Sequence, residues 1–242
     1  RFNHFIQHDK TSGQVVCEGH VTFDELLHLD NDKIPPVLPG TRFATLAGGV
    51  AHDVHGKNNH FEGALGQHIQ WLDLLTPKEL LRCSPDQHPD LFHATIAGAG
   101  LTGFIYRLAM QLKSAPRMLE VNHHSFDSLA HLLAFMSLEG LNASYQVAWI
   151  DLLNMEPRGI VSAADYKNAP LQPDSTSHRL PRLPFRLVNR QTMTWFNALY
   201  YKRKPKTEVT TLAQFNNPLD AIKNWDALYG RKGLVQFQAV FG

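Results

Sequence analysis

The residues with the clearest chemical potential lie in one short segment, residues 48–60, which reads GGVAHDVHGKNNH. Three of the 14 histidines in the chain fall there. His52 and His55 have His-x-x-His spacing with a carboxylate between them, and His60 follows, so imidazoles and a carboxylate are available for a metal site. Such spacing becomes specific for zinc only with a second ligand pair or a helical motif, and Gly56 interrupts any helix here. We therefore expect no metal site.

The same region also has the composition of a cofactor cradle. Pro39-Gly40-Thr41 and Gly48-Gly49 combine residues that lack a Cβ atom with hydroxyl groups, so backbone amides there can approach a phosphate or a flat ring closely. Neither GxGxxG nor GxxxxGK[ST] is present, which leaves nicotinamide and ATP sites without motif support. The other alternative is that glycine-rich turns simply connect strands and that the histidines are ordinary residues. Spacing alone favours this last alternative.

Composition and charge exclude several classes of protein. The 242 residues are 43% hydrophobic and 19% charged, as in a globular protein with a sizeable core. Lys and Arg total 23 against 22 Asp and Glu, so we expect no nucleic-acid partner. GxSxG is absent and spacing assembles no Ser-His-Asp set, which disfavours a hydrolase. Cys17 and Cys83 are too few for a disulfide framework and are expected to be buried, and with no signal peptide we expect a cytoplasmic protein.

Hydrophobic alternation and turn residues predict the elements of the first half of the chain. Thr22 and Glu25 form a capping box that opens a helix. Residues 34–49, rich in Pro and Gly, are expected to be extended chain and turns. We further predict strands at 14–18, 69–75, 79–83 and 104–112, and a helix that begins at Pro89.

The pattern changes near Ser114, so we expect a boundary between residues 1–114 and 115–242. The second part is predicted to contain strands from Met118, at 145–152 and at 159–163, and helices over 129–136 and 189–201. The chain as a whole is therefore expected to be α+β, with an antiparallel sheet in the second part. A further strand is predicted at 234–241.

The last predicted helix carries an aromatic stripe that has two interpretations. The stripe consists of Trp195, Phe196, Leu199 and Tyr200, and a basic run over 202–206 follows it. It can face lipid while the basic run meets anionic headgroups, which would suit a membrane surface. Such stripes more often belong to a core, so we expect a core-facing helix with a solvated basic end.

Two longer segments show a resemblance to a known family. VLPGTRFATLAGGVAHDVHGKNNHFEGALGQHIQWLDLLTP and, further on, DLFHATIAGAGLTGFI resemble the FAD-linked oxidases of the vanillyl-alcohol-oxidase type. YQVAWIDLL and YGRKGLVQFQ resemble that family's substrate-domain segments, so the similarity covers most of the chain. The DVHGKN block is a specific match.

The resemblance implies a fold and a cofactor. In that family a bipartite domain binds FAD, and a second α+β domain covers the isoalloxazine ring and receives the substrate. Residues 1–114 would then be the second part of the FAD-binding domain, and residues 115–242 part of the substrate domain, with FAD held noncovalently. Since the chain would lack segments of the family at both ends, we expect the part given to bind FAD weakly and to have no turnover.

The resemblance also implies site residues. His55 would lie beside the flavin ring and stabilise charge or tune its potential, and Lys57 would fix substrate hydroxyls or phosphate, which makes these two the catalytic candidates. Trp149, Gln236 and Gln238 would line the substrate pocket with Lys57. The residues expected at FAD are Gly40, Thr41, Thr45, Leu46, Ala47, Gly48, His52, Asp53, Val54, His55 and Ile105. Three positions depart from the family's pattern, since Ala47 and Ala97 replace glycine and His52 replaces a small residue.

The implied reaction is oxidation of a secondary hydroxyl of a sugar or polyol, in which a base removes the hydroxyl proton while hydride passes to flavin N5. A lipid-linked pentose is one candidate substrate. The step would then belong to an epimerisation of a cell-wall precursor that a short-chain reductase completes. The alternatives are an aldonolactone or alditol oxidase and a degenerate, non-catalytic binding module.

Overall fold

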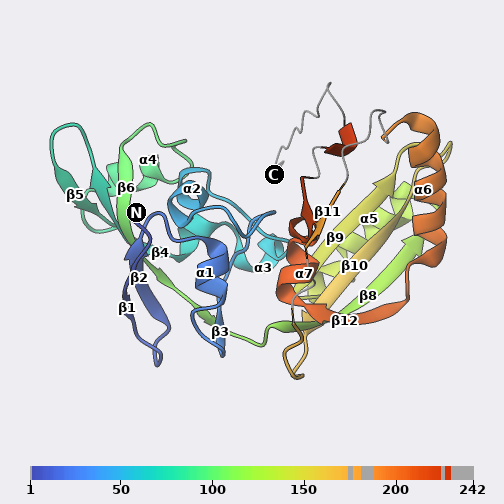
Figure 1. Cartoon of the computed structure of the whole chain (residues 1–242), viewed down its shortest axis with the longest axis horizontal. Coiled ribbons are helices and arrows are strands. Elements are labelled where there is room, and N and C mark those ends of the chain that lie inside the picture. Colours follow the sequence, from blue (N-terminus) through green and yellow to red (C-terminus); the bar gives the residue numbers. More distant parts are fainter. Residues whose placement is uncertain (1, 174–176, 181–187, 225–226, 230–242) are drawn as a thin grey trace.

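The computed structural model describes residues 2–173, 177–180, 188–224 and 227–229. They form two larger antiparallel sheets that follow one another along the chain (Figure 1). The first sheet has the strand order β1-β2-β6-β4-β5. Its strands are β1 (Phe5–His8), β2 (Gln14–Glu18), β4 (Ile69–Leu75), β5 (Leu80–Cys83) and β6 (Phe104–Gln111). The expected strands of the first half are therefore confirmed, and β4 and β5 form an antiparallel hairpin.

Short helices cover the first sheet. Thr22 opens the first of them through the predicted capping box, because its hydroxyl accepts the Glu25 N–H at 3.2 Å while the Glu25 carboxylate accepts the Thr22 N–H at 2.8 Å. The α-helices are α1 (Phe23–Leu27), α2 (Leu46–Ala51), α3 (Asn59–Glu62) and α4 (Pro89–Thr95), and a 3₁₀ turn spans Leu65–His68. Phe23, Leu46 and Leu65 are fully buried beneath them.

Helix α2 corrects one expectation, since residues 34–49 are not all extended chain and turns. Thr45 caps this helix by accepting the Gly48 N–H at 3.1 Å, which fixes its first turn despite two glycines. Gly49 lies against Phe23, where a Cβ atom would come within 2.8 Å of two ring atoms. Close packing, rather than a turn conformation, explains a glycine at this position.

The second sheet has the order β12-β8-β10-β9 and is entirely antiparallel. Its strands are β8 (Met118–Phe126), β9 (Tyr145–Asp151), β10 (Arg158–Tyr166) and β12 (Thr207–Thr211). The helices in this part are α5 (Leu129–Ser137), α6 (Arg190–Arg203) and α7 (Leu212–Asn216), with 3₁₀ turns at Gly140–Asn142 and Pro218–Ala221. Helices and antiparallel sheets together confirm the α+β class.

Two short strand pairs complete the described elements. β3 (Lys33–Ile34) pairs antiparallel with β7 (Lys113–Ser114), at the place where the chain leaves the first sheet. β11 (His178–Arg179) pairs parallel with β13 (Ile222–Lys223). The strand predicted at 234–241 lies outside the described residues, as does much of the proline-rich loop before α6.

The two faces of the second sheet have different neighbours. Helix α5 covers one face, where Leu132 packs directly over Gly159 of β10. The register places Val147, Ser162 and His123 side by side on the opposite face, together with Trp149. Tyr145 lies on this opposite face too and packs against the Phe215 ring of α7, with ring centroids 6.2 Å apart.

Helix α6 corrects a second expectation. Trp195 is 70% exposed and Phe196 49% exposed, so the core-facing orientation was wrong for these two side chains. The helix instead turns Asn197 and Tyr200 inward, and the Tyr200 ring lies 4.9 Å from that of Trp149. Cys17 and Cys83 are free and buried, as predicted. Along the described residues, no helix has the length and apolar character needed to cross a bilayer.

Candidate cofactor site

A cavity of about 570 Å³ opens beside the histidine-rich segment. Two stretches of chain, 38–40 and 52–57, form most of its wall, and Asn216 of α7 completes it. The structure therefore gathers six of the residues that sequence reasoning had placed in the site. They are Gly40, His52, Asp53, Val54, His55 and Lys57.

The stretch 52–57 is fixed by its connections to α2 and to the following 3₁₀ turn. Asp53 adopts a left-handed backbone conformation with φ of 42° directly after His52, the C-cap of α2. Its carboxylate accepts the Gly66 N–H at 2.7 Å, and the Val54 carbonyl accepts the Leu65 N–H at 2.9 Å. Asp53 therefore shapes the cavity wall by holding the chain.

The three histidines of the segment contact three different carbonyl oxygens. His52 Nδ1 lies 3.1 Å from the Gly48 carbonyl oxygen, and His55 Nδ1 lies 3.4 Å from that of Gly56. His60 turns away toward the second half of the chain, where its Nε2 lies 2.8 Å from the Ala143 carbonyl oxygen. Within the described ranges, no three His, Cys, Asp or Glu side chains form a group that could hold a metal ion.

Two asparagines that follow β12 in the sequence hold the stretch 38–40 in place. Asn216 Nδ2 donates to the carbonyl oxygens of Leu38 and Pro39, both at 2.9 Å, and Asn217 Nδ2 donates to that of Pro39 at 2.6 Å. Both asparagines are buried. Because these bonds satisfy carbonyl groups of an irregular segment away from water, they stabilise one conformation of the cavity wall.

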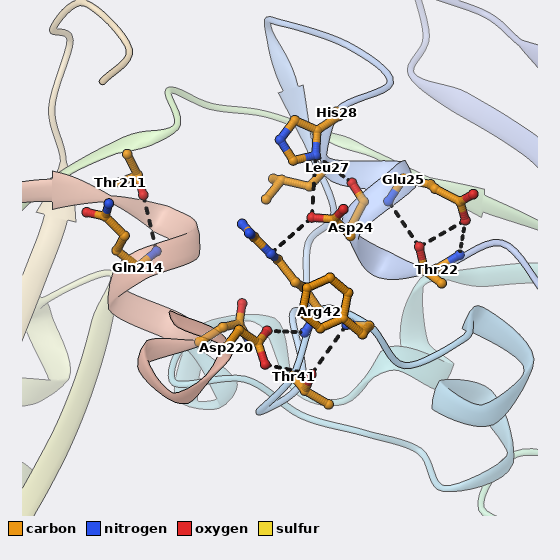
Figure 2. A network of polar contacts seen from close by, with 12 residues as sticks. Thr22, Asp24, Glu25, Leu27, His28, Thr41, Arg42, Thr211, Gln214 and Asp220 are labelled. Carbon is orange, nitrogen blue, oxygen red and sulfur yellow. Dashed lines mark hydrogen bonds and ion pairs between the residues drawn. The ribbon is translucent and has the colours of Figure 1, made fainter. Parts of the chain in front are cut away.

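A second set of contacts fixes the next turn of the same loop (Figure 2). The Asp220 carboxylate accepts the Thr41 hydroxyl at 2.8 Å and the Arg42 N–H at 2.9 Å. The Arg42 guanidinium lies 3.0 Å from the Asp24 carboxylate of α1. The loop 38–42 is thus held between α1 and the segment that follows α7.

Lys57 lies at the end of the cavity that faces the second half of the chain. Its ammonium donates to the Phe215 carbonyl oxygen and lies 4.7 Å from the centre of the Phe215 ring. Burial lowers the pKa of Lys57 to about 8, and the positive charge of Lys204 adds to this shift. A lysine with such a pKa exchanges its proton near neutral pH and retains a strong affinity for an anion while protonated.

Other predicted site residues do not line this cavity. Thr41 lines a separate cavity of about 770 Å³ that also borders Asp220. The Thr45 hydroxyl is occupied as a helix cap, and the side chains of Leu46 and Ile105 belong to the hydrophobic core. Ala47 and Gly48 lie in the first turn of α2, Trp149 lies on the second sheet, and Gln236 and Gln238 lie outside the described residues.

Sequence reasoning missed Asn216, Asn217 and Asp220, whose side chains form hydrogen bonds with the loop 38–42. The only local signal was the polar turn Asn216-Asn217-Pro218 after a short apolar helix. A turn predicts where the chain reverses but carries no information about a partner 178 positions away. Such contacts become visible only when the two halves of the chain are placed together.

A buried Ser-His-Glu arrangement was also missed. His123, whose side chain is 3% exposed, lies with Nδ1 2.8 Å from Ser162 Oγ and Nε2 3.0 Å from the Glu208 carboxylate. Burial lowers its pKa, and Lys204 adds to the shift. Ser162 lies in the middle of β10 between two paired strands, so nearby N–H groups are used in the sheet and do not form an oxyanion hole. The arrangement therefore ties β8, β10 and β12 together and does not form a hydrolase site.

Named proteins with similar sequences are oxidases and a dehydrogenase, which agrees with the resemblance found in the sequence. No protein-family model matches the chain. It is 32% identical, over 258 aligned positions, to decaprenylphosphoryl-beta-D-ribose oxidase of Mycolicibacterium smegmatis. That alignment covers 96% of this chain and 55% of the relative, so the chain spans about half the length of that protein.

Two further relatives match over shorter segments. A putative D-arabinono-1,4-lactone oxidase of Neurospora crassa is 32% identical over 107 residues, which are 43% of this chain and 19% of that protein. Cytokinin dehydrogenase 9 of Oryza sativa subsp. japonica is 38% identical over 52 residues, which are 21% of this chain and 10% of that protein. The relatives share an oxidative reaction class and differ in the substrate that their names give.

Proposed function

We propose that this chain is part of an FAD-dependent oxidoreductase that oxidises a secondary hydroxyl group of a sugar or polyol. In this proposal residues 1–114 are the second part of a bipartite FAD-binding domain and residues 115–242 are part of the substrate domain. The cavity beside residues 52–57 takes one side of a noncovalently bound flavin. The observation that carries the proposal is this cavity, together with similarity to a ribose oxidase over 96% of the chain.

The residues of the cavity suit a flat, polar cofactor. A Cβ atom on Gly40 would have no neighbour within 4 Å, so the wall is open at the point where a ring must approach. Asn216 donates through its amide nitrogen, but its buried carbonyl oxygen has no hydrogen-bond partner among the described residues. A buried acceptor of this kind costs free energy unless a donor reaches it, and the N–H groups of a flavin are such donors.

The roles of the individual residues follow from their positions. When bound, FAD supplies the electron acceptor for the hydroxyl carbon of the substrate. His55 stabilises or tunes that cofactor from the side of the cavity, next to Gly40, His52 and Val54. Lys57, while it is protonated, binds the hydroxyl or phosphate oxygens of the substrate. Its lowered pKa also allows it to accept or donate a proton near neutral pH.

The substrate proposed here is a lipid-linked pentose, as in the name of the ribose oxidase relative. The product would be a keto sugar, which a short-chain reductase must then reduce to complete an epimerisation. The second candidate function is an aldonolactone or alditol oxidase, which the putative arabinonolactone oxidase among the relatives favours. Peroxide release with oxygen as the acceptor separates the second candidate from the first.

The decisive experiment uses the full-length protein. Oxidised flavin should copurify with it, and anaerobic addition of a sugar phosphate, polyol or lactone should bleach the visible absorbance of the flavin. We expect the 242-residue chain alone to retain flavin weakly and to show no turnover. A full-length protein that holds flavin but is bleached by none of these compounds would exclude the proposed substrate class. If the full-length protein holds no flavin, the remaining alternative would be a non-catalytic binding module.

A further inference from the structure

Helix α6 and the turn between β9 and β10 bear large apolar side chains that point to solvent. Two come from α6, Trp195 and Phe196, and the two most exposed of those in the turn between β9 and β10 are Leu152 at 71% and Met155 at 97%. We name these four residues the end patch. Figure 1 shows α6 at the extremity of the molecule, on the opposite side of the second sheet from the first sheet.

Buried polar contacts join the two elements of the end patch. Asn197 Nδ2 of α6 donates to the Asp151 carboxylate at the end of β9 at 2.7 Å. Arg158 at the start of β10 lies 3.3 Å from the same carboxylate and 4.6 Å from the centre of the Tyr201 ring. The turn and the helix therefore present their apolar side chains from one connected support.

The surroundings of the end patch are basic. Residues 188–206 contain five Lys and Arg residues and no Asp or Glu. Lys202 follows Trp195 by seven positions, which is two helical turns, so the two side chains share a face of α6, and Arg203 follows directly. Glu156 is the one acidic residue of the turn at 152–157.

We infer that the end patch docks on the surface of a lipid bilayer that carries anionic headgroups. Trp, Phe, Leu and Met side chains bury in the interfacial layer, and Lys202 and Arg203 meet the lipid phosphates. A stable protein partner requires about 800 Å² on each side, whereas the end patch consists of four side chains on one turn and one helix. A bilayer accepts such a small surface because lipids rearrange around it.

The inference does not depend on the proposed flavin reaction. The end patch lies on α6 and on the β9–β10 turn, away from the cavity beside residues 52–57. Docking on a membrane would bring the second sheet close to a lipid-linked substrate, but it is equally compatible with a soluble one. Loss of membrane binding and loss of flavin reduction are therefore separate outcomes of separate experiments.

The test is flotation of the full-length protein with lipid vesicles. Wild type should float with vesicles rich in phosphatidylglycerol and much less with pure phosphatidylcholine. Trp195→Ala combined with Met155→Asp should lower the partition coefficient on anionic vesicles by about tenfold or more. Lys202→Ala combined with Arg203→Ala should lower it by about tenfold on anionic vesicles and leave binding to phosphatidylcholine unchanged.

A matched control separates the end patch from exposed apolar surface in general. Leu101, which is 90% exposed in the first half of the chain, is changed to Asp and should bind vesicles as wild type does. All variants must retain the circular dichroism and melting temperature of wild type. Wild-type protein that floats with neither type of vesicle would overturn the inference, as would equal flotation of wild type and the Trp195→Ala, Met155→Asp protein. A protein partner would then be the occupant to seek.

Discussion

Asp220 accepts the backbone N–H of Arg42 at 2.9 Å, although the two residues are 178 positions apart. The same carboxylate accepts the Thr41 hydroxyl at 2.8 Å, so one side chain holds the loop that forms a wall of the proposed flavin cavity. Gly40, which lines the cavity, directly precedes these two anchored residues. The shape of the site therefore depends on residues from both halves of the chain.

Asp220→Ala should destabilise the protein and loosen the cavity wall. The loss of two hydrogen bonds to a carboxylate should lower the free energy of unfolding by about 1 to 3 kcal/mol, measured by urea denaturation. The full-length variant should also bind FAD more weakly. Asp165→Ala is the matched control, because Asp165 also accepts two bonds, both from Ser144 and none from the loop. If both variants bind FAD equally well, the loop is not part of the site.

Lys57 should make stability depend on pH in the alkaline range. Its pKa falls from 10.5 in the unfolded chain to about 8 in the folded protein, so between these values the unfolded chain binds more protons. The contribution of Lys57 to the unfolding free energy therefore rises with pH across this window. Lys57→Met should be more stable than wild type by about 1 to 2 kcal/mol near pH 7, and the difference should shrink toward pH 10.

Urea denaturation at several pH values measures this difference. The exposed Lys78 provides the control, since Lys78→Met should change stability by the same small amount throughout the range. A constant difference between wild type and Lys57→Met would show that Lys57 titrates as an ordinary lysine. Binding of inorganic phosphate by the full-length protein should weaken in parallel as pH rises through about 8, because Lys57 loses its charge there.

Two glycines of the site region should respond differently to alanine. A Cβ atom on Gly49 would lie 2.8 Å from the Phe23 ring and 3.0 Å from Leu65, so Gly49→Ala should cost about 1 to 3 kcal/mol through overpacking. Gly40 has open space around it, so Gly40→Ala should leave the melting temperature unchanged. In the full-length protein Gly40→Ala should weaken FAD binding. Equal melting temperatures for both variants would contradict the packing described for α2.

Replacement of Ala97 by glycine should stabilise the protein. Ala97 adopts φ of 59°, a left-handed conformation that costs an alanine free energy. Ala97→Gly should therefore raise the free energy of unfolding by up to about 1 kcal/mol, measured by thermal denaturation. Ala198→Gly in the middle of α6 is the control and should lower it by about 0.5 to 1 kcal/mol. Destabilisation of both variants to the same extent would argue against strain at Ala97.

The sequence predicted those elements whose signals are local. Thr22 and Glu25 define a helix start within four residues, and the alternation of residue types in 104–112 is typical of a strand such as β6. Helix α2 was missed because Gly48 and Gly49 weaken helix propensity, while the Thr45 cap and contact with Phe23 compensate. The orientation of α6 was missed because an aromatic stripe predicts an apolar face, not whether another element covers it.

Only one side of the candidate site, the wall formed by residues 52–57, was predictable from the sequence. His52, Asp53, His55 and Lys57 stand in one segment, and resemblance to a family marked that segment as a cofactor wall. Asn216 and Asp220 come from the other half of the chain, and no spacing rule connects residues so far apart. These two residues could be identified as part of the site only from the tertiary structure.

The central claim is that FAD binds beside His55, and titration of FAD into the full-length apoprotein tests it most directly. His55→Ala should raise the dissociation constant by about tenfold, which is about 1.4 kcal/mol, or shift the flavin absorbance spectrum. His60→Ala, in the same segment but turned toward Ala143, should leave both unchanged. If His55→Ala binds FAD with the affinity and the spectrum of wild type, the flavin lies elsewhere and the account of the site is wrong.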